Sequence, residues 1–124
     1  FQFAGSAYHT HFPLHHAAAA GDTVKVASLL ASFSDPNAKD LGGWTALHVA
    51  ANAARNNVIL LLLRSHAYID KEIPSSGNKA LHMAISRGHS DTAALLLQAG
   101  ASRQLEDGQG RTAIQTAHGI AAAD

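Results

Sequence analysis

The sequence predicts an all-α solenoid in which a short helix-turn-helix unit is repeated along the chain. The tetrapeptides FPLH, TALH, KALH and TAIQ end at positions 15, 48, 82 and 115, so successive copies are 33, 34 and 33 residues apart. Each of the first three is followed by a run of small residues, a turn and a leucine-rich run. A fixed period of this length is typical of proteins whose neighbouring units share one core. We therefore expect about three full repeats and a partial fourth.

The first helix of each unit is predicted to begin at the tetrapeptide. Thr45 is a good helix cap because its hydroxyl can accept a hydrogen bond from the first turn, and the ring of Pro13 already fixes a helical φ. Leu47, Ala50 and Ala51 then recur at helical spacing and form one apolar face. Their small side chains predict that neighbouring helices approach closely.

The second helix is predicted to follow a turn at Gly21, Ala54 or Gly88. Its apolar stripe is expected to contain Val26, Leu29 and Leu30, then Ile59, Leu62 and Leu63, then Ala93, Leu96 and Leu97. Helices of two to three turns do not persist alone in water, so stacking must stabilise them. Gly100 suits the left-handed residue that closes such a helix, and His66 can replace it. Phe33 does not fit there, so we expect its helix to end differently or Phe33 to pack inward.

These features resemble the ankyrin repeat, a unit of ~33 residues that carries T-P-L-H-x-A. The similarity covers roughly 110 residues. On this interpretation the single domain comprises an irregular N-terminal cap (1–11), repeats at 12–40, 41–73 and 74–107, and a partial repeat at 108–124.

Nine histidines raise the question of a metal site. His15, His48 and His82 share one repeat position, and the resemblance implies that each bonds near the start of its own helix and to the adjoining loop. His89 lies at the family's Gly-His turn and is also expected to be structural. A metal would need His9, His11 and His16 to converge. We predict neither a metal nor a cofactor.

Composition argues against several function classes. Nine basic and nine acidic residues are scattered, without the basic stripe that nucleic-acid binding needs. The longest apolar run, Val58 to Leu63, is far shorter than a membrane span. Cysteine is absent, which fits an intracellular location. The chain begins at Phe1 without an initiator methionine or a signal segment, so we expect a piece of a longer protein or a processed product. We also expect it to be a monomer or part of a longer chain.

No catalytic constellation stands out. The serines and threonines occupy no recognisable nucleophile turn, the acids fall mostly at turn positions, and no phosphate-binding loop occurs. We predict that this chain is not an enzyme.

The resemblance implies that a protein partner binds to the hairpin tips and to a concave groove lined by the first helices. Trp44 is the first candidate because aromatic residues and arginine dominate interface energetics. The alternative is that Trp44 packs across its hairpin onto the neighbouring unit. Carried over residue by residue, the candidates are Leu41, Trp44, Val49, Asn52, Asn78, Met83, Ser86, Arg87 and Arg111.

Three further possibilities stay open at this stage. The chain could be a regulatory or targeting segment of a larger enzyme or channel that packs mainly against its own chain, or a purely structural spacer. The resemblance also makes Asn37 a candidate for asparaginyl hydroxylation, with Leu29 eight residues before it and Asp35 two before. Alternatively, Asn37 supports the hairpin through hydrogen bonds from its side chain to the backbone.

Overall fold

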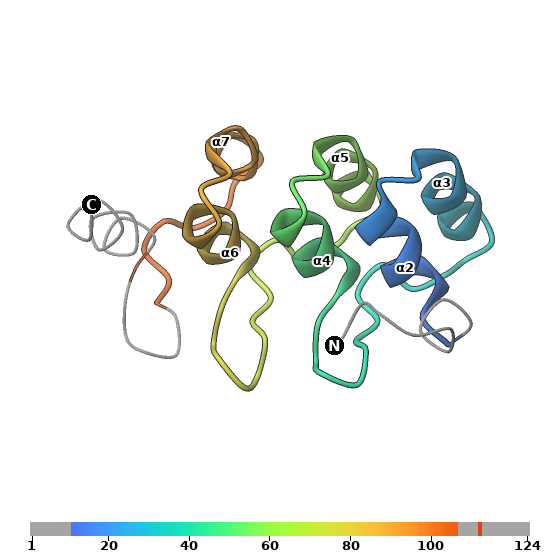
Figure 1. The fold of residues 1–124 in the computed structure, drawn as a ribbon, viewed down its shortest axis with the longest axis horizontal. Coiled ribbons are helices and arrows are strands. Elements are labelled where there is room, and N and C mark those ends of the chain that lie inside the picture. Colours follow the sequence, from blue (N-terminus) through green and yellow to red (C-terminus); the bar gives the residue numbers. More distant parts are fainter. Residues whose placement is uncertain (1–10, 107–111, 113–124) are drawn as a thin grey trace.

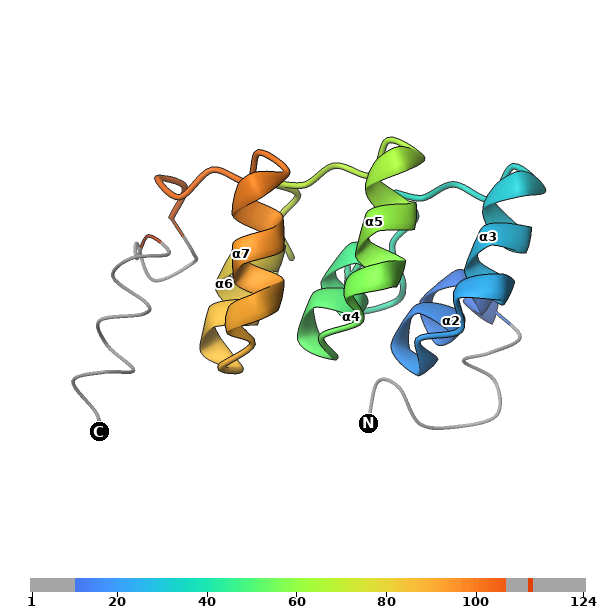
Figure 2. The same ribbon diagram turned by 90° about the horizontal axis from the view of Figure 1, so that it is seen from above.

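The computed structural model describes residues 11–106 and residue 112. Within these residues the chain forms three helix pairs and no strand. Figures 1 and 2 show the pairs side by side, with the first helices in one layer and the second helices in another. The elements are α2 (Pro13–Ala20), α3 (Thr23–Ala31), α4 (Ala46–Asn52), α5 (Asn56–Arg64), α6 (Ala80–Ser86) and α7 (Ser90–Gln98).

Helices of one layer pack on each other across the repeats. In the first layer α4 contacts both α2 and α6, and in the second layer α3 contacts α5. The loops that join successive pairs extend away from the second layer, toward the lower edge of Figure 1. The predicted all-α solenoid is therefore confirmed, whereas the exact repeat boundaries stay a prediction. The predicted cap lies outside the described residues except for His11, and so does most of the partial repeat.

The first helices begin where the tetrapeptides predicted. Thr45 has extended backbone angles, and its N–H donates to Nδ1 of His48 at 3.1 Å while the His48 N–H donates back to Thr45 Oγ1 at 3.4 Å. This reciprocal pair satisfies amides of the first turn that lack a partner within the helix. In the third repeat an ammonium group cannot accept such a bond, but the Lys79 N–H still donates to Nδ1 of His82 at 3.4 Å.

Among the three helix pairs, α4 and α5 contribute the largest share of the buried apolar residues. Helix α4 is covered from both sides, and all its residues except Asn52 are buried. In α5 the side chains of Val58, Ile59 and Leu62 are buried, as are Leu47 and Leu81 in the first layer. Val58 was not part of the predicted stripe, whereas Leu29, Leu30, Leu63 and Leu97 from that stripe are only partly buried.

The expectation for Phe33 is wrong in both of its forms. Helix α3 ends at Ala31 and α5 ends at Arg64, one repeat period later. The two helices therefore end at equivalent repeat positions. Phe33 adopts a left-handed φ of 66°, as His66 does at 70°, and its side chain is 96% exposed. Hydrogen bonds from the N–H groups of Phe33 and Ser34 to the last turn of α3 hold this geometry, and they direct the ring to solvent.

We expect Leu62→Ala to reduce the free energy of unfolding by about 2–5 kcal/mol, because it leaves a cavity between the layers. Leu60 offers a matched control on the same helix, since its side chain is 40% exposed while that of Leu62 is 0% exposed. Leu60→Ala should cost less than about 1.5 kcal/mol. Urea denaturation of both variants checks this, and equal losses would contradict the assignment of the core.

We expect Phe33→Gly to stabilise the chain by about 0.5–1 kcal/mol, because glycine adopts the left-handed conformation without strain. Ser32 provides the control, since its φ of −87° needs no glycine. Ser32→Gly should be neutral or destabilising. The melting temperatures of the two variants measure the difference, and a loss of stability in Phe33→Gly would show that the ring makes contacts which outweigh the strain.

Candidate functional site

A shallow hollow lies between the first helices of the second and third repeats. Its volume is about 200 Å³. All of its lining residues belong to the set that the sequence nominated as partner contacts. They are Trp44, Asn52, Asn78, Met83, Ser86 and Arg87.

The repeat itself places these residues opposite one another. Trp44 lies directly before the cap of α4, and Asn78 holds the same position before α6, 34 residues later. Asn52 and Ser86 are likewise the last residues of α4 and α6. Because α4 and α6 pack side by side, equivalent residues of two successive repeats border the hollow. One pair lies before the first turns of the two helices, and the other pair lies at their last residues. Arg87 follows directly as the C-cap of α6.

The Trp44 ring is half-buried and held in place by its own repeat. It meets the His48 ring edge-on, with 6.5 Å between the centroids and 66° between the planes. Asp40 fixes the backbone on either side, since its carboxylate accepts from the N–H groups of Gly42 and Trp44, both at 2.9 Å. The ring therefore contributes to the fold and still borders the hollow. This agrees with the turn position expected for Asp40 from the sequence, where an acid stabilises backbone amides.

Buried histidines connect the first helices α2 and α4 to the next loop. The Nε2 atom of His15 lies 2.7 Å from the Trp44 carbonyl oxygen, and that of His48 lies 2.7 Å from the Lys71 carbonyl oxygen. Because Nδ1 of His48 accepts from the Thr45 N–H, the neutral ring carries its proton on Nε2 and donates it to Lys71. His48 thus makes both bonds expected from the resemblance, while His15 makes the bond to the next loop and His82 makes the bond at the start of its own helix. The His15 contact orders the loop that carries Trp44.

Burial lowers the pKa of His48 from 6.5 to about 4, and it lowers the pKa of His15 as well. For His48 the carbonyl groups of Lys71 and Asn78 and the charge of Asp40 oppose this shift, but desolvation outweighs them, and the nearby His15 adds to it. Both rings are therefore neutral in the folded chain at pH 7.

We expect the free energy of unfolding to fall as the pH is lowered from 7 to 4. The unfolded chain binds a proton near pH 6.5 that folded His48 accepts only near pH 4, so the stabilisation is complete above 6.5 and is lost below it. The loss from His48 alone is about 3 kcal/mol at pH 4. Urea denaturation at both pH values measures it. His48→Gln cannot titrate, and an equally steep loss in that variant would contradict the assignment.

The structure does not gather every nominated residue at the hollow. The prediction that Val49 contacts a partner is wrong, since its side chain is 0% exposed in the centre of α4. Met83 is also buried, with only an edge at the hollow. Leu41 is 96% exposed but does not line the hollow. Arg111 lies outside the described residues.

Arg87 brings a positive charge to the hollow. It is exposed, and among the described residues its guanidinium forms no ion pair. Lys79, the cationic residue directly before α6, differs from Arg87 because its charge is already paired. Its ammonium pairs with Glu72 at 3.4 Å and donates to the Gly77 carbonyl oxygen at 3.1 Å. Arg87 is therefore available to a ligand, whereas Lys79 is part of the fold.

Asn37 connects two successive loops. Its Oδ1 accepts from the Tyr68 N–H at 2.7 Å, and its Nδ2 donates to the His66 carbonyl oxygen at 3.2 Å. Asp70, one period later, accepts from the Ser102 N–H at 3.0 Å in the same way. These contacts give Asn37 a structural role between repeats, and its hydroxylation stays a prediction.

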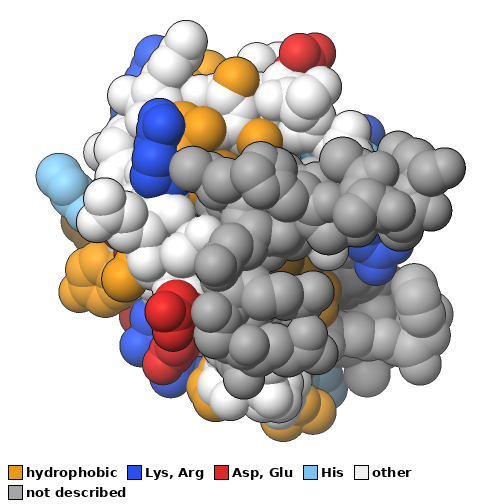
Figure 3. Space-filling model, turned by 90° about the vertical axis from the view of Figure 1, so that its left-hand side faces the viewer, with side chains coloured by type: hydrophobic (Ala, Val, Ile, Leu, Met, Phe, Trp, Pro, Cys, Tyr) orange, Lys and Arg blue, Asp and Glu red, His pale blue; other side chains and the backbone are white. Residues whose placement is uncertain are grey.

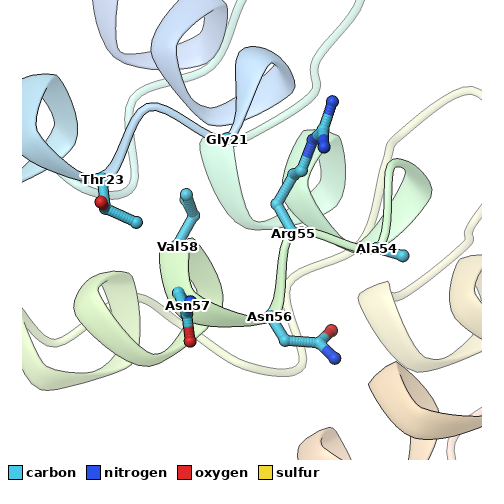
Figure 4. Close-up of a pocket in the computed structure, with 7 residues that line it drawn as sticks. All are labelled: Gly21, Thr23, Ala54, Arg55, Asn56, Asn57 and Val58. Carbon is cyan, nitrogen blue, oxygen red and sulfur yellow. The ribbon is translucent and has the colours of Figure 1, made fainter.

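A second hollow, of about 420 Å³, lies at the turns between the paired helices (Figure 4). Arg55 extends past Gly21, and its Nε donates to the Ala19 carbonyl oxygen at 3.0 Å. A Cβ on Gly21 would lie 3.0 Å from the Arg55 side chain. Asn56 accepts from the Thr92 hydroxyl at 2.6 Å. Arg55 and Asn56 therefore serve contacts between repeats, and the hollow beside α6 remains the stronger candidate.

Residues 11–106 and 112 contain neither a metal-binding cluster nor a membrane-spanning helix. No group of three His, Asp or Glu side chains there is arranged to hold a metal ion, and His9 lies outside this range. Helices long and apolar enough to cross a membrane are also absent from it. Figure 3, viewed from the C-terminal side, shows basic, acidic and hydrophobic side chains on the described part of that face.

Comparison with known proteins agrees with the architecture. A family model for ankyrin repeats (3 copies) matches residues 4–74 and 52–121, which together span nearly the whole chain. The chain belongs to the ankyrin repeat family. Ankyrin repeats act as non-catalytic modules of protein interaction, which fits a surface hollow better than a reaction centre.

The relatives that match this chain are much longer proteins. The chain is 40% identical over 91 residues to the E3 ubiquitin-protein ligase KEG of Arabidopsis thaliana, covering 72% of this chain and 6% of that protein. It is 36% identical over 87 residues to the human SMC5-SMC6 complex localization factor protein 1, covering 68% and 8%. The chain thus spans less than a tenth of either relative's length.

Proposed function

We propose that this ankyrin repeat chain binds a partner protein through its hairpin tips and through the first-helix surface around the hollow between α4 and α6. The observation that carries the proposal is the hollow itself. It joins Trp44 and Arg87 from two successive repeats on an accessible surface. Its lining residues all occupy positions at which the resemblance to ankyrin repeats implies contact with a partner.

The chemistry of these residues suits protein recognition. Tryptophan and arginine are enriched among the residues that dominate binding energies at protein interfaces. The His48 contact and the Asp40 hydrogen bonds already hold the Trp44 segment in place, so a partner would not have to order it. Preorganisation of this kind reduces the entropic cost of association.

We propose further that the chain acts without catalysis, cofactor or nucleic acid, and inside the cell. The second candidate role is a regulatory or targeting segment that packs against a larger parent protein. The relatives support it, because the matching segment makes up only 6% and 8% of their lengths. One of them is named as a localization factor, and recruitment through such a module is consistent with that name.

We expect Arg87→Ala to weaken partner binding by about tenfold, because alanine removes an arginine that contributes to an interface. The binding partner is obtained by displaying human and plant proteome peptides on phage and selecting against the folded 124-residue chain. Affinities of the selected peptides are then measured by isothermal titration calorimetry.

Arg64→Ala is the matched control, since Arg64 is exposed at the end of α5 in the other helix layer. Its affinity should stay within about twofold of the unsubstituted chain. If selected peptides lose affinity equally in both variants, or in neither, the binding surface lies elsewhere.

A further inference from the structure

The residues that line the hollow between α4 and α6 include one cationic side chain and no acidic one, and this charge points to the ligand. We propose that it accepts an aspartate or glutamate side chain of the partner, next to an apolar partner residue that packs on Trp44 and Met83. This inference rests on the proposed function and specifies the chemistry of the bound segment.

Arg87 supplies the charge for this recognition. It is the charged residue among those that line the hollow, and its guanidinium forms no ion pair within the described part of the chain. A guanidinium presents paired N–H donors that match the two oxygens of a carboxylate. A lysine or arginine of a partner would be repelled from the same place.

The acids in the flanking loops do not compete for Arg87. Asp40 is buried and accepts two backbone N–H groups beside Trp44. Glu72 pairs with the ammonium of Lys79. The positive charge at the hollow is therefore left for a carboxylate from outside the described residues.

The neutral polar residues of the hollow strengthen the case. The side-chain amides of Asn52 and Asn78 and the hydroxyl of Ser86 form no hydrogen bonds to other described residues. Each of these groups can donate, and an ionised carboxylate only accepts. One carboxylate can thus be held by Arg87 and by neutral donors on both sides of the hollow.

The size and the apolar wall select a side chain over a small molecule. At about 200 Å³ the hollow is smaller than the roughly 300–1,000 Å³ of typical small-molecule sites. The Trp44 ring and the edge of Met83 form its apolar part. A carboxylate followed or preceded by an apolar residue would satisfy both parts at once.

The test uses the fluorescence of Trp44, which is the only tryptophan of the chain and borders the hollow. The intact 124-residue chain is titrated with four pools of acetylated and amidated heptapeptides. The pools have random flanking residues and a central Glu, Gln, phosphoserine or Lys. The best binder from the Glu pool is then resynthesised with Gln at its centre.

We expect the Glu pool to change the Trp44 emission, and the Gln counterpart of its best binder to bind about tenfold more weakly. Arg87→Gln should weaken the Glu peptide by a similar factor and leave the Gln peptide unchanged. Arg87→Lys should restore part of the affinity, and Arg64→Gln should have no effect. Raising the salt concentration should weaken only the Glu peptide, because exposed charge pairs are screened.

Equal affinity for the Glu and Gln peptides would overturn the charge assignment while leaving a protein-binding hollow in place. Tighter binding of the Lys pool, or of the phosphoserine pool by more than tenfold, would also overturn it. If none of the pools moves the Trp44 signal, and phage-selected peptides do not either, the proposed function of this surface fails as well.

Discussion

The structure depends on contact between neighbouring repeats, because none of its helices could persist alone. Each described helix has seven to nine residues, which is too short for stability in water. Stacking supplies what the single helix lacks: α4 is packed between α2 and α6, and its leucine, valine and alanines are buried. Polar contacts reinforce this packing, since His15, His48 and Asn37 each bond to the backbone of the next repeat or loop.

The candidate binding surface is a consequence of the same stacking. Trp44 and Asn78 occupy one repeat position, and Asn52 and Ser86 occupy another, so two successive repeats border the hollow with equivalent edges. A repeat that lost its neighbour would lose half of the site. Specificity then arises where the repeats differ. Trp44 in one repeat and Arg87 in the next give the hollow an apolar side and a cationic side.

Much of this fold could be predicted from the sequence, since the tetrapeptides, the turns and the leucine runs recur at a fixed period. The loop contacts of His15 and His48 were also predictable, because the resemblance to ankyrin repeats implied them for this repeat position. The burial of Val49 could not be predicted in this way. It arises because α4 is covered by neighbouring helices on two sides, and the pattern of one helix does not reveal this. Phe33 failed for a related reason. Propensity argues against a left-handed phenylalanine, but the hydrogen bonds that close α3 impose that conformation.

Hydrogen exchange of the backbone amides in the intact chain, resolved residue by residue with NMR, tests most directly whether the repeats stabilise one another. We predict the slowest exchange in α4 and α5, with an opening free energy equal to that of global unfolding, because these helices lie in the middle of the described stack. Fast exchange in α4 while α6 and α7 stay protected would contradict the account, because it would mean that a helix pair folds independently of its neighbour.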